Sequence, residues 1–191
     1  MIVPVYYDKF NVQSILKRSA ADLSAAEEAA KSIIADVISR GDDALREYTL
    51  KFDGALSDDF AVGEEEFAAA ERAVGVNYLS VLKRSADNIA KFHRAQLRSG
   101  FKLEEDGCVV GQRVIPLESA GIYVPGGKAA YPSTVLMNAL PAKIAGVKRI
   151  VMVTPPMRDG SVKPEVLAAA RVAGIDEVYK VGGAQAIAAL A

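Results

Sequence analysis

Cysteine and histidine are almost absent from this sequence, which has one of each among 191 residues. The single cysteine, Cys108, excludes an internal disulfide and fits a reducing compartment. The single histidine, His93, excludes a zinc site built from three or four of the ordinary side-chain ligands. We expect His93 to lie at the edge of a helical core and Cys108 to pack as a small, buried or half-buried hydrophobe.

Long apolar runs and an excess of one charge are absent as well. The longest apolar run, centred on IVMV, is far shorter than the ~18 residues that a membrane span needs, and Met1 is not followed by a signal peptide pattern. The net charge is −1, and neither half of the chain is strongly basic. With 51% hydrophobic and 25% charged residues, the sequence predicts a cytoplasmic globular protein without nucleic-acid or membrane partners.

The first hundred residues have a helical pattern. Ser24 followed by Glu27 is a capping box, which predicts a helix from about Ala25 to Arg40. A short helix is predicted near Glu64 to Val74, and a longer one from Asn77, with apolar residues at threes and fours. We interpret residues 1–100 as a helical N-terminal region.

The apolar period changes to about two after this region. Phe101–Leu103 and Val109–Leu117 are predicted to form a hairpin through the turn Glu104–Gly107, in which Asp106-Gly107 is the turn dipeptide. Three further strands alternate with two helices, which is the pattern of a Rossmann-like unit. The predicted strands are Ser119–Val124, Lys148–Thr154 and Glu177–Val181, and the helices are Pro132–Gly146 and Pro164–Ala173. The fold class is therefore α/β: a helical N-terminal layer, then an incomplete parallel βαβαβ unit within residues 101–191. The last helix has no ending signal, so we expect the chain to be the front part of a longer protein.

Two loops of this unit lie where ligands usually bind, at the carboxyl ends of parallel strands. They are GIYVPGGKAAYPST, from Gly121 to Thr134, and VGGAQ, from Val181 to Gln185. Glycines allow close backbone approach and expose N–H groups at a helix N-terminus, a favourable place for pyrophosphate. Neither loop reads G-x-G-x-x-G, and no acidic residue stands at the usual distance to hold a ribose. On the glycines alone, nucleotide binding and plain tight turns both stay open.

Two side chains in these loops are candidate ligand contacts. Tyr123 lies at the end of a strand, immediately before the glycines of the first loop. Its position fits a packing role and a ligand contact equally well. Gln185 places an amide in the first turn of the last helix, where it could orient a ribose or an amide group.

Several segments resemble the histidinol dehydrogenase family. GIYVPGGKAAYPSTVLMNALPAKIAGVKRIVMVTPP followed by VGGAQAIAALA is similar to that family's sequences. RGDDALREYTLKFDG (Arg40–Gly54) and NIAKFHRAQ (Asn88–Gln96) resemble its helical N-terminal region. The resemblance covers the whole chain, and because family members are much longer, it implies that this chain corresponds to their N-terminal half.

The resemblance also implies an activity. The family's enzymes oxidise L-histidinol to L-histidine with two NAD, and they are homodimers with a bound zinc ion. Their zinc ligands and acid–base residues lie in the part that follows Ala191, so the resemblance implies no catalytic residue and no metal ligand in this chain. Tyr123 and Gln185 match family residues that bind NAD. The chain would thus supply the NAD platform and be inactive alone.

Two other interpretations stay open. The chain could be a stand-alone module for NAD binding or dimerisation, which predicts saturable NAD binding without catalysis. It could also be a structural remnant that folds and binds nothing, which predicts a thermal transition that NAD does not shift.

Overall fold

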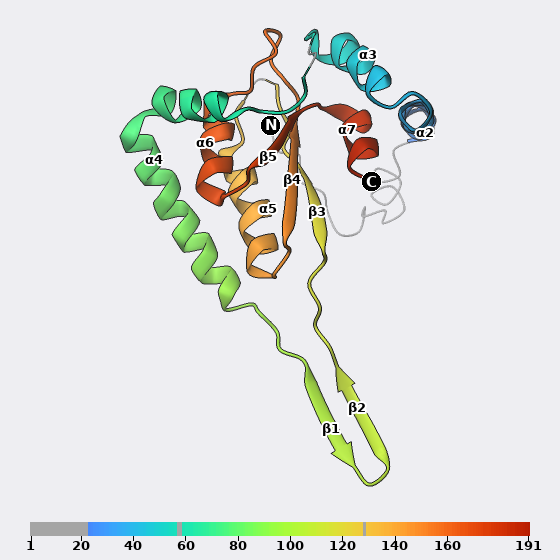
Figure 1. The fold of residues 1–191 in the computed structure, drawn as a ribbon, viewed down its shortest axis with the longest axis vertical. Helices are drawn as coiled ribbons and strands as arrows, with labels where there is room; N and C mark the ends of the chain where they lie inside the picture. The colour runs from blue at the N-terminus through green and yellow to red at the C-terminus, as the bar shows by residue number, and fades with distance from the viewer. Residues whose placement is uncertain (1–22, 57–58, 128) are drawn as a thin grey trace, which may run out of the picture.

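A three-stranded parallel sheet, in the order β3-β4-β5, lies at the centre of the chain (Figure 1). In this computed structural model, which describes residues 23–56, 59–127 and 129–191, the strands are β3 (Ser119–Tyr123), β4 (Arg149–Thr154) and β5 (Glu177–Lys180). Helices α5 (Pro132–Ile144) and α6 (Pro164–Ala173) connect them. The predicted βαβαβ unit is confirmed, and β4 is its central strand, as a continuous apolar run indicates.

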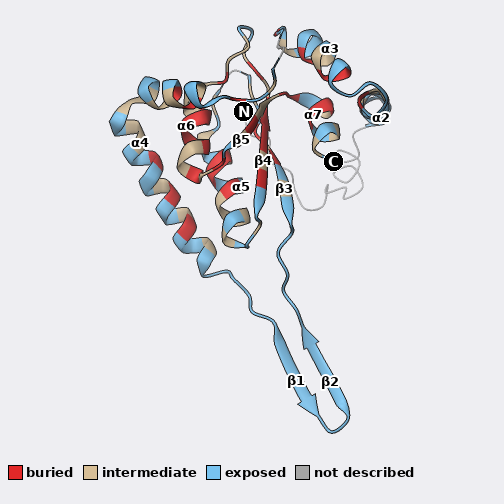
Figure 2. Cartoon of the chain, viewed as in Figure 1, coloured by how far each residue is buried: buried red, intermediate tan, exposed pale blue. Residues whose placement is uncertain are grey.

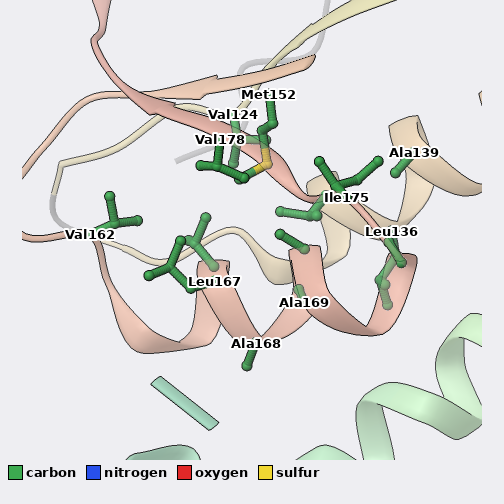
Figure 3. Packing of buried hydrophobic residues seen from close by; sticks show 14 of the residues in the cluster. Val124, Leu136, Ala139, Met152, Val162, Leu167, Ala168, Ala169, Ile175 and Val178 are labelled. Atoms are coloured by element: carbon green, nitrogen blue, oxygen red, sulfur yellow. The ribbon is translucent and has the colours of Figure 1, made fainter. Parts of the chain in front are cut away.

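One face of the sheet packs against α5 and α6, and the long helix α4 (Glu64–Arg94) covers these two helices from outside. Figure 3 shows Met152 and Val178 of the sheet facing Leu167 of α6. Leu136 of α5 is 2% exposed in the same cluster. This cluster is the larger of the two hydrophobic cores formed by the described residues.

The other face packs against α2 (Ser24–Arg40), α3 (Asp42–Asp53) and α7 (Gly183–Leu190). Its smaller core includes Val153 of β4 and Leu45 of α3. Helices from the first hundred residues therefore cover both faces of the sheet. The division at residue 100 stays a prediction, and residues 1–22 of that region lie outside the described ranges. In the part that is described, no helix is long and apolar enough to cross a membrane.

The first described helix begins one residue earlier than predicted. Helix α2 starts at Ser24 itself, with Leu23 as the cap residue, so Ser24 lies in the first turn and not at the predicted cap position. At the start of α4 the backbone N–H of the cap residue Gly63 donates to the Glu66 carboxylate at 3.2 Å, which is the glutamate half of a capping box. The two helices predicted within 64–94 are confirmed: α4 consists of two helical segments that are separated at Gly75, whose φ of 75° and ψ of 166° are non-helical.

A basic side chain fastens α6 to α4. The guanidinium of Arg171 donates to the Glu64 carboxylate at 2.5 Å and lies 4.4 Å from the centre of the Phe67 ring. A cation over an aromatic face adds to the apolar packing of the two helices. Glu64 therefore has two roles: it stabilises the N-terminus of α4, and it binds α6 through Arg171.

The hairpin formed by β1 (Phe101–Glu105) and β2 (Cys108–Gln112) projects away from the sheet (Figure 1). Asp106-Gly107 is its turn, as predicted, with Gly107 at φ 77°. All residues of both strands are exposed (Figure 2). Two expectations were wrong: β2 ends at Gln112 rather than continuing to Leu117, and Cys108 is exposed. Strand β2 ends at Gln112 because that residue pairs with Phe101, the first residue of β1. Cys108 is exposed because the hairpin projects away from any core.

Candidate functional site

The structure brings the two glycine loops together. Strand β3 ends at Tyr123 and helix α7 begins at Gly183. The backbone N–H of Gly183 donates a hydrogen bond to the Tyr123 hydroxyl at 3.2 Å. Tyr123 is half-buried and packs on the smaller core. Its hydroxyl therefore marks the place where the loop after β3 meets the N-terminus of α7.

Gln185 lies in the first turn of α7 and is 0% exposed. Neither its amide oxygen nor its amide nitrogen has a hydrogen-bond partner within the described residues. A buried amide without partners costs free energy, so such a group calls for an explanation. Gly183 has φ 65°, and a side chain at that position would collide with the Gln185 amide. The turn therefore leaves the amide close to the backbone at the start of α7.

The loops that follow the three parallel strands converge on Pro155. A Cβ atom on Gly126 would lie 2.6 Å from the Pro155 ring, and one on Gly182 would lie 2.5 Å from it. Each glycine thus allows a close approach that any larger residue would prevent. Because these residues follow β3, β4 and β5 in turn, the carboxyl ends of all three strands form one contiguous surface.

A cavity of about 470 Å³ opens at this surface, at the ends of β3 and β4. Its walls include the glycine loop Pro125–Gly127, the buried Thr154 and the start of α6. The ammonium group of Lys163 donates to the carbonyl oxygen of Gly127 at 2.6 Å and so ties the glycine loop to α6. This is where an open α/β sheet usually binds ligands, and the volume is in the range of small-molecule sites. Residue 128 of the predicted loop lies outside the described residues.

An acidic residue that sequence spacing does not locate also lines the cavity. Asp53, the last residue of α3, contributes a carboxylate whose Oδ2 is buried and lacks a partner in the part of the chain that is described. Burial raises the pKa of the Asp53 carboxyl above its ordinary value. No acidic residue is close to the glycine loops in the sequence, as expected, but the packing of α3 brings Asp53 beside the first of them. This neighbour depends on the tertiary fold and cannot be predicted from sequence spacing.

A second cavity, of about 410 Å³, lies between α3, the strands β4 and β5, and the end of α7. Leu190 lines it and packs closely against Gly121 of β3. Of the second glycine loop, Val181 lines this cavity, and Gln185 lines neither cavity. The first glycine loop, Pro125–Gly127, lines only the cavity at the strand ends, which is therefore the better candidate.

The remaining sequence candidates lie far from this site. His93 is half-buried near the end of α4, edge-on to the ring of Phe92. Cys108 is on the hairpin. Across the described ranges, no group of three or more histidine, cysteine, aspartate or glutamate side chains is placed to hold a metal ion. The residues seen here thus do not fit a zinc site.

Comparisons with known proteins bear on the whole chain. The family model described as histidinol dehydrogenase matches residues 16–191. A histidinol dehydrogenase of Geobacillus kaustophilus is 54% identical over 160 residues, which are 83% of this chain and 38% of the relative. That of Heliobacterium mobile is 44% identical and covers 100% of this chain, but 46% of the relative.

A solved structure agrees with the sequence comparisons. The crystal structure of histidinol dehydrogenase from Elizabethkingia anophelis superposes with a TM-score of 0.83 at 38% identity, over 89% of this chain and 39% of that one. The chain thus spans less than half the length of these relatives and matches the N-terminal part of the family. The family model, the relatives and the solved structure agree, so this chain belongs to the histidinol dehydrogenase family.

Proposed function

We propose that this chain is the NAD-binding platform of a cytoplasmic histidinol dehydrogenase, with Tyr123 and Gln185 as cofactor contacts. The complete enzyme would oxidise L-histidinol to L-histidine with two NAD, as a homodimer with zinc held outside the residues described here. The unpartnered, fully buried amide of Gln185 carries the proposal. A polar group kept inside a fold at a cost in stability is typical of a functional site.

The geometry around the amide supports this assignment. Gln185 makes no hydrogen bond that would hold its amide inside, so rotation toward a ligand at the α7 N-terminus breaks none. Tyr123 lies at the same terminus, where backbone N–H groups favour an anionic group such as a pyrophosphate. The cavity beyond Pro155 supplies room for the rest of a dinucleotide along the strand ends.

The division of labour follows from the side chains present. Bound NAD would accept hydride from the substrate. This chain's own residues would bind and orient the cofactor and shield it from water. The described part holds no cluster of metal-ligating side chains and its single histidine is remote from the loops. We therefore expect no histidinol oxidation by the chain alone, measured as NADH absorbance with added zinc.

Thermal unfolding with and without NAD tests the platform directly. NAD at saturating concentration should raise the Tm of the chain, because a ligand that binds only the folded state stabilises it. Tyr123→Phe should weaken NAD binding about 10-fold, the equivalent of one lost hydrogen bond. The matched control is Tyr131→Phe, which removes a hydroxyl from an exposed residue of the same loop.

Two results would count against the proposal. A Tm that NAD leaves unchanged would favour a structural part that binds no nucleotide. An equal loss of affinity in Tyr123→Phe and Tyr131→Phe would place the ligand elsewhere on the loop. Saturable NAD binding together with histidinol oxidation would instead show that the chain carries its own catalytic groups.

A further inference from the structure

One face of the hairpin carries most of its apolar side chains. The register pairs Leu103 with Val110 and Glu105 with Cys108, and because side chains alternate along a strand, Phe101 lies on the same face as these residues. The opposite face carries Val109, Gly111 and an ion pair between Lys102 and Glu104. The apolar hairpin face is defined here as Phe101, Leu103, Cys108 and Val110, which share this side of the hairpin with Glu105 and Gln112 near its two ends.

Nothing in the described part of the chain covers this face. Phe101, Leu103 and Val110 are 55%, 56% and 53% exposed. The segment that returns to β3 adds more exposed apolar side chains, Val114, Ile115 and Leu117. A two-stranded hairpin is marginally stable on its own, and contiguous exposed apolar surface usually marks an interaction site. The amphipathic pattern therefore indicates a surface that is packed in the assembled protein.

We propose that the apolar hairpin face packs against the C-terminal part of a histidinol dehydrogenase polypeptide. The relatives supply the length: this chain spans 38% to 46% of the histidinol dehydrogenases compared above. More than half of each relative thus has no counterpart among these residues. The proposal rests on family membership and not on NAD binding, so failure of the NAD proposal would leave it intact.

The position of α7 would allow a following polypeptide segment to reach the hairpin. Leu190, at the end of α7, packs against Gly121 of β3. The N-terminal end of β3 leads directly back to the hairpin (Figure 1). A polypeptide that continued beyond α7 would thus start beside the strand from which the hairpin extends.

A second copy of the chain fits the face less well. A stable dimer buries about 800 Å² on each partner. One face of two five-residue strands measures roughly 17 Å by 10 Å, which is far too small to supply that area alone. A continuous polypeptide needs much less contact area, because the two parts do not have to associate from free solution.

Cys108 is the chain's only cysteine and lies on the apolar hairpin face, which makes it a probe of that face. The test compares alkylation of Cys108 by iodoacetamide, followed by peptide mass spectrometry, in this chain alone and in a fusion. The fusion joins residues 1–191 to the C-terminal part of the Bacillus subtilis histidinol dehydrogenase, which is 51% identical over 178 residues. Alkylation in the fusion should be about 100-fold slower, since a packed thiol reacts only after local opening.

The matched control moves the thiol to the other face of the same strand. In the double variant Cys108→Ser with Val109→Cys, alkylation should be equally fast in the chain alone and in the fusion. Equal rates for Cys108 in both proteins would overturn the proposal. Slow alkylation in the chain alone that accelerates on dilution would also overturn it, because a second copy would then be the cover.

A second measurement covers the case in which the fusion does not fold. Cysteines are placed in the intact Bacillus subtilis enzyme at the positions that align with Cys108 and Val109. Protection of the first position alone supports the proposal. Reactivity at both positions, or protection at both, would overturn the assignment of the apolar hairpin face.

Discussion

At the scale of the residue, the buried and unpartnered amide of Gln185 is best explained by a function, because it lowers the stability of the fold. Replacing its amide by an apolar group of similar size removes two buried polar atoms that have no partners among the described residues. We expect Gln185→Leu to raise the free energy of unfolding by about 1 kcal/mol and to abolish the Tm increase caused by NAD. Urea denaturation with and without NAD measures both effects.

The control for this variant is Asn138→Leu, which replaces an exposed amide on α5 that donates to the Thr134 carbonyl oxygen. It should change neither stability nor NAD binding beyond about 0.5 kcal/mol. A Gln185→Leu protein that is clearly less stable would show that the amide supports the fold. The functional interpretation of its burial would then fail.

The Asp53 carboxylate predicts a pH dependence of stability. Its pKa in the folded state is raised above the ordinary 3.8 by burial, so the folded state binds more protons than the unfolded state just above pH 3.8. Stability contributed by this group is therefore present below that pH and is lost as the pH rises through the raised pKa. We expect Asp53→Asn to be more stable than the parent at pH 7 by less than about 1 kcal/mol, because partial exposure screens the charge.

The comparison is made by thermal unfolding of both proteins between pH 3 and pH 7. Their difference in Tm should shrink toward acid pH, where the carboxyl is protonated in both states. A difference that grows toward acid pH would mean that the Asp53 carboxylate has a stabilising partner.

Sequence and structure agree on single residues where local chemistry decides. Turn glycines place Tyr123 at the end of a strand and Gln185 in the first turn of a helix, and the structure confirms both positions and joins the two loops through Tyr123 and Gly183. Their role as NAD contacts stays a prediction. Asp53 and Cys108 escape sequence reasoning because their surroundings are set by distant packing: α3 turns one toward a cavity, and the hairpin carries the other away from the core.

At the scale of the element, the kink in α4 depends on Gly75. Its φ of 75° and ψ of 166° lie outside the helical region within a helix of 31 residues. A Cβ atom there would meet nothing within 4 Å, so any cost of substitution is conformational. We expect Gly75→Ala to lower stability by about 1–2 kcal/mol, measured as a lower urea midpoint.

Gly63 provides the matched control, since its φ of −82° suits any residue and its Cβ would also meet open space. Gly63→Ala removes a favourable cap residue and should cost about 0.5 kcal/mol, less than Gly75→Ala. If both variants cost the same, the kink is not maintained by the left-handed conformation of Gly75.

Most elements are predictable because their signals are local. The βαβαβ order and the hairpin turn follow from apolar periods and from turn residues. Ser24 is not at the predicted cap position because the helix starts a residue earlier than the motif requires. The placement of α4 on one face of the sheet, with α2 and α3 on the other, depends on contacts between distant segments, which no local pattern encodes.

At the scale of the whole molecule, the central strand joins the two cores. Neighbouring residues of β4 point to opposite faces, so Met152 belongs to the larger core and Val153 to the smaller one. Helices α4, α5 and α6 thus share a strand with α2, α3 and α7. We infer that the helical N-terminal region and the βαβαβ unit unfold together and not as two independent domains.

Two core substitutions test this coupling. Leu136→Ala truncates a side chain of the larger core that is 2% exposed, and Leu45→Ala truncates one of the smaller core that is 6% exposed. Each should cost about 2–5 kcal/mol, through lost burial and the cavity left behind. If the sheet couples the cores, both variants lower the midpoint of one shared transition, and circular dichroism and tyrosine fluorescence follow the same curve. A variant that shifts only one of two resolved transitions would instead show that each face of the sheet unfolds separately.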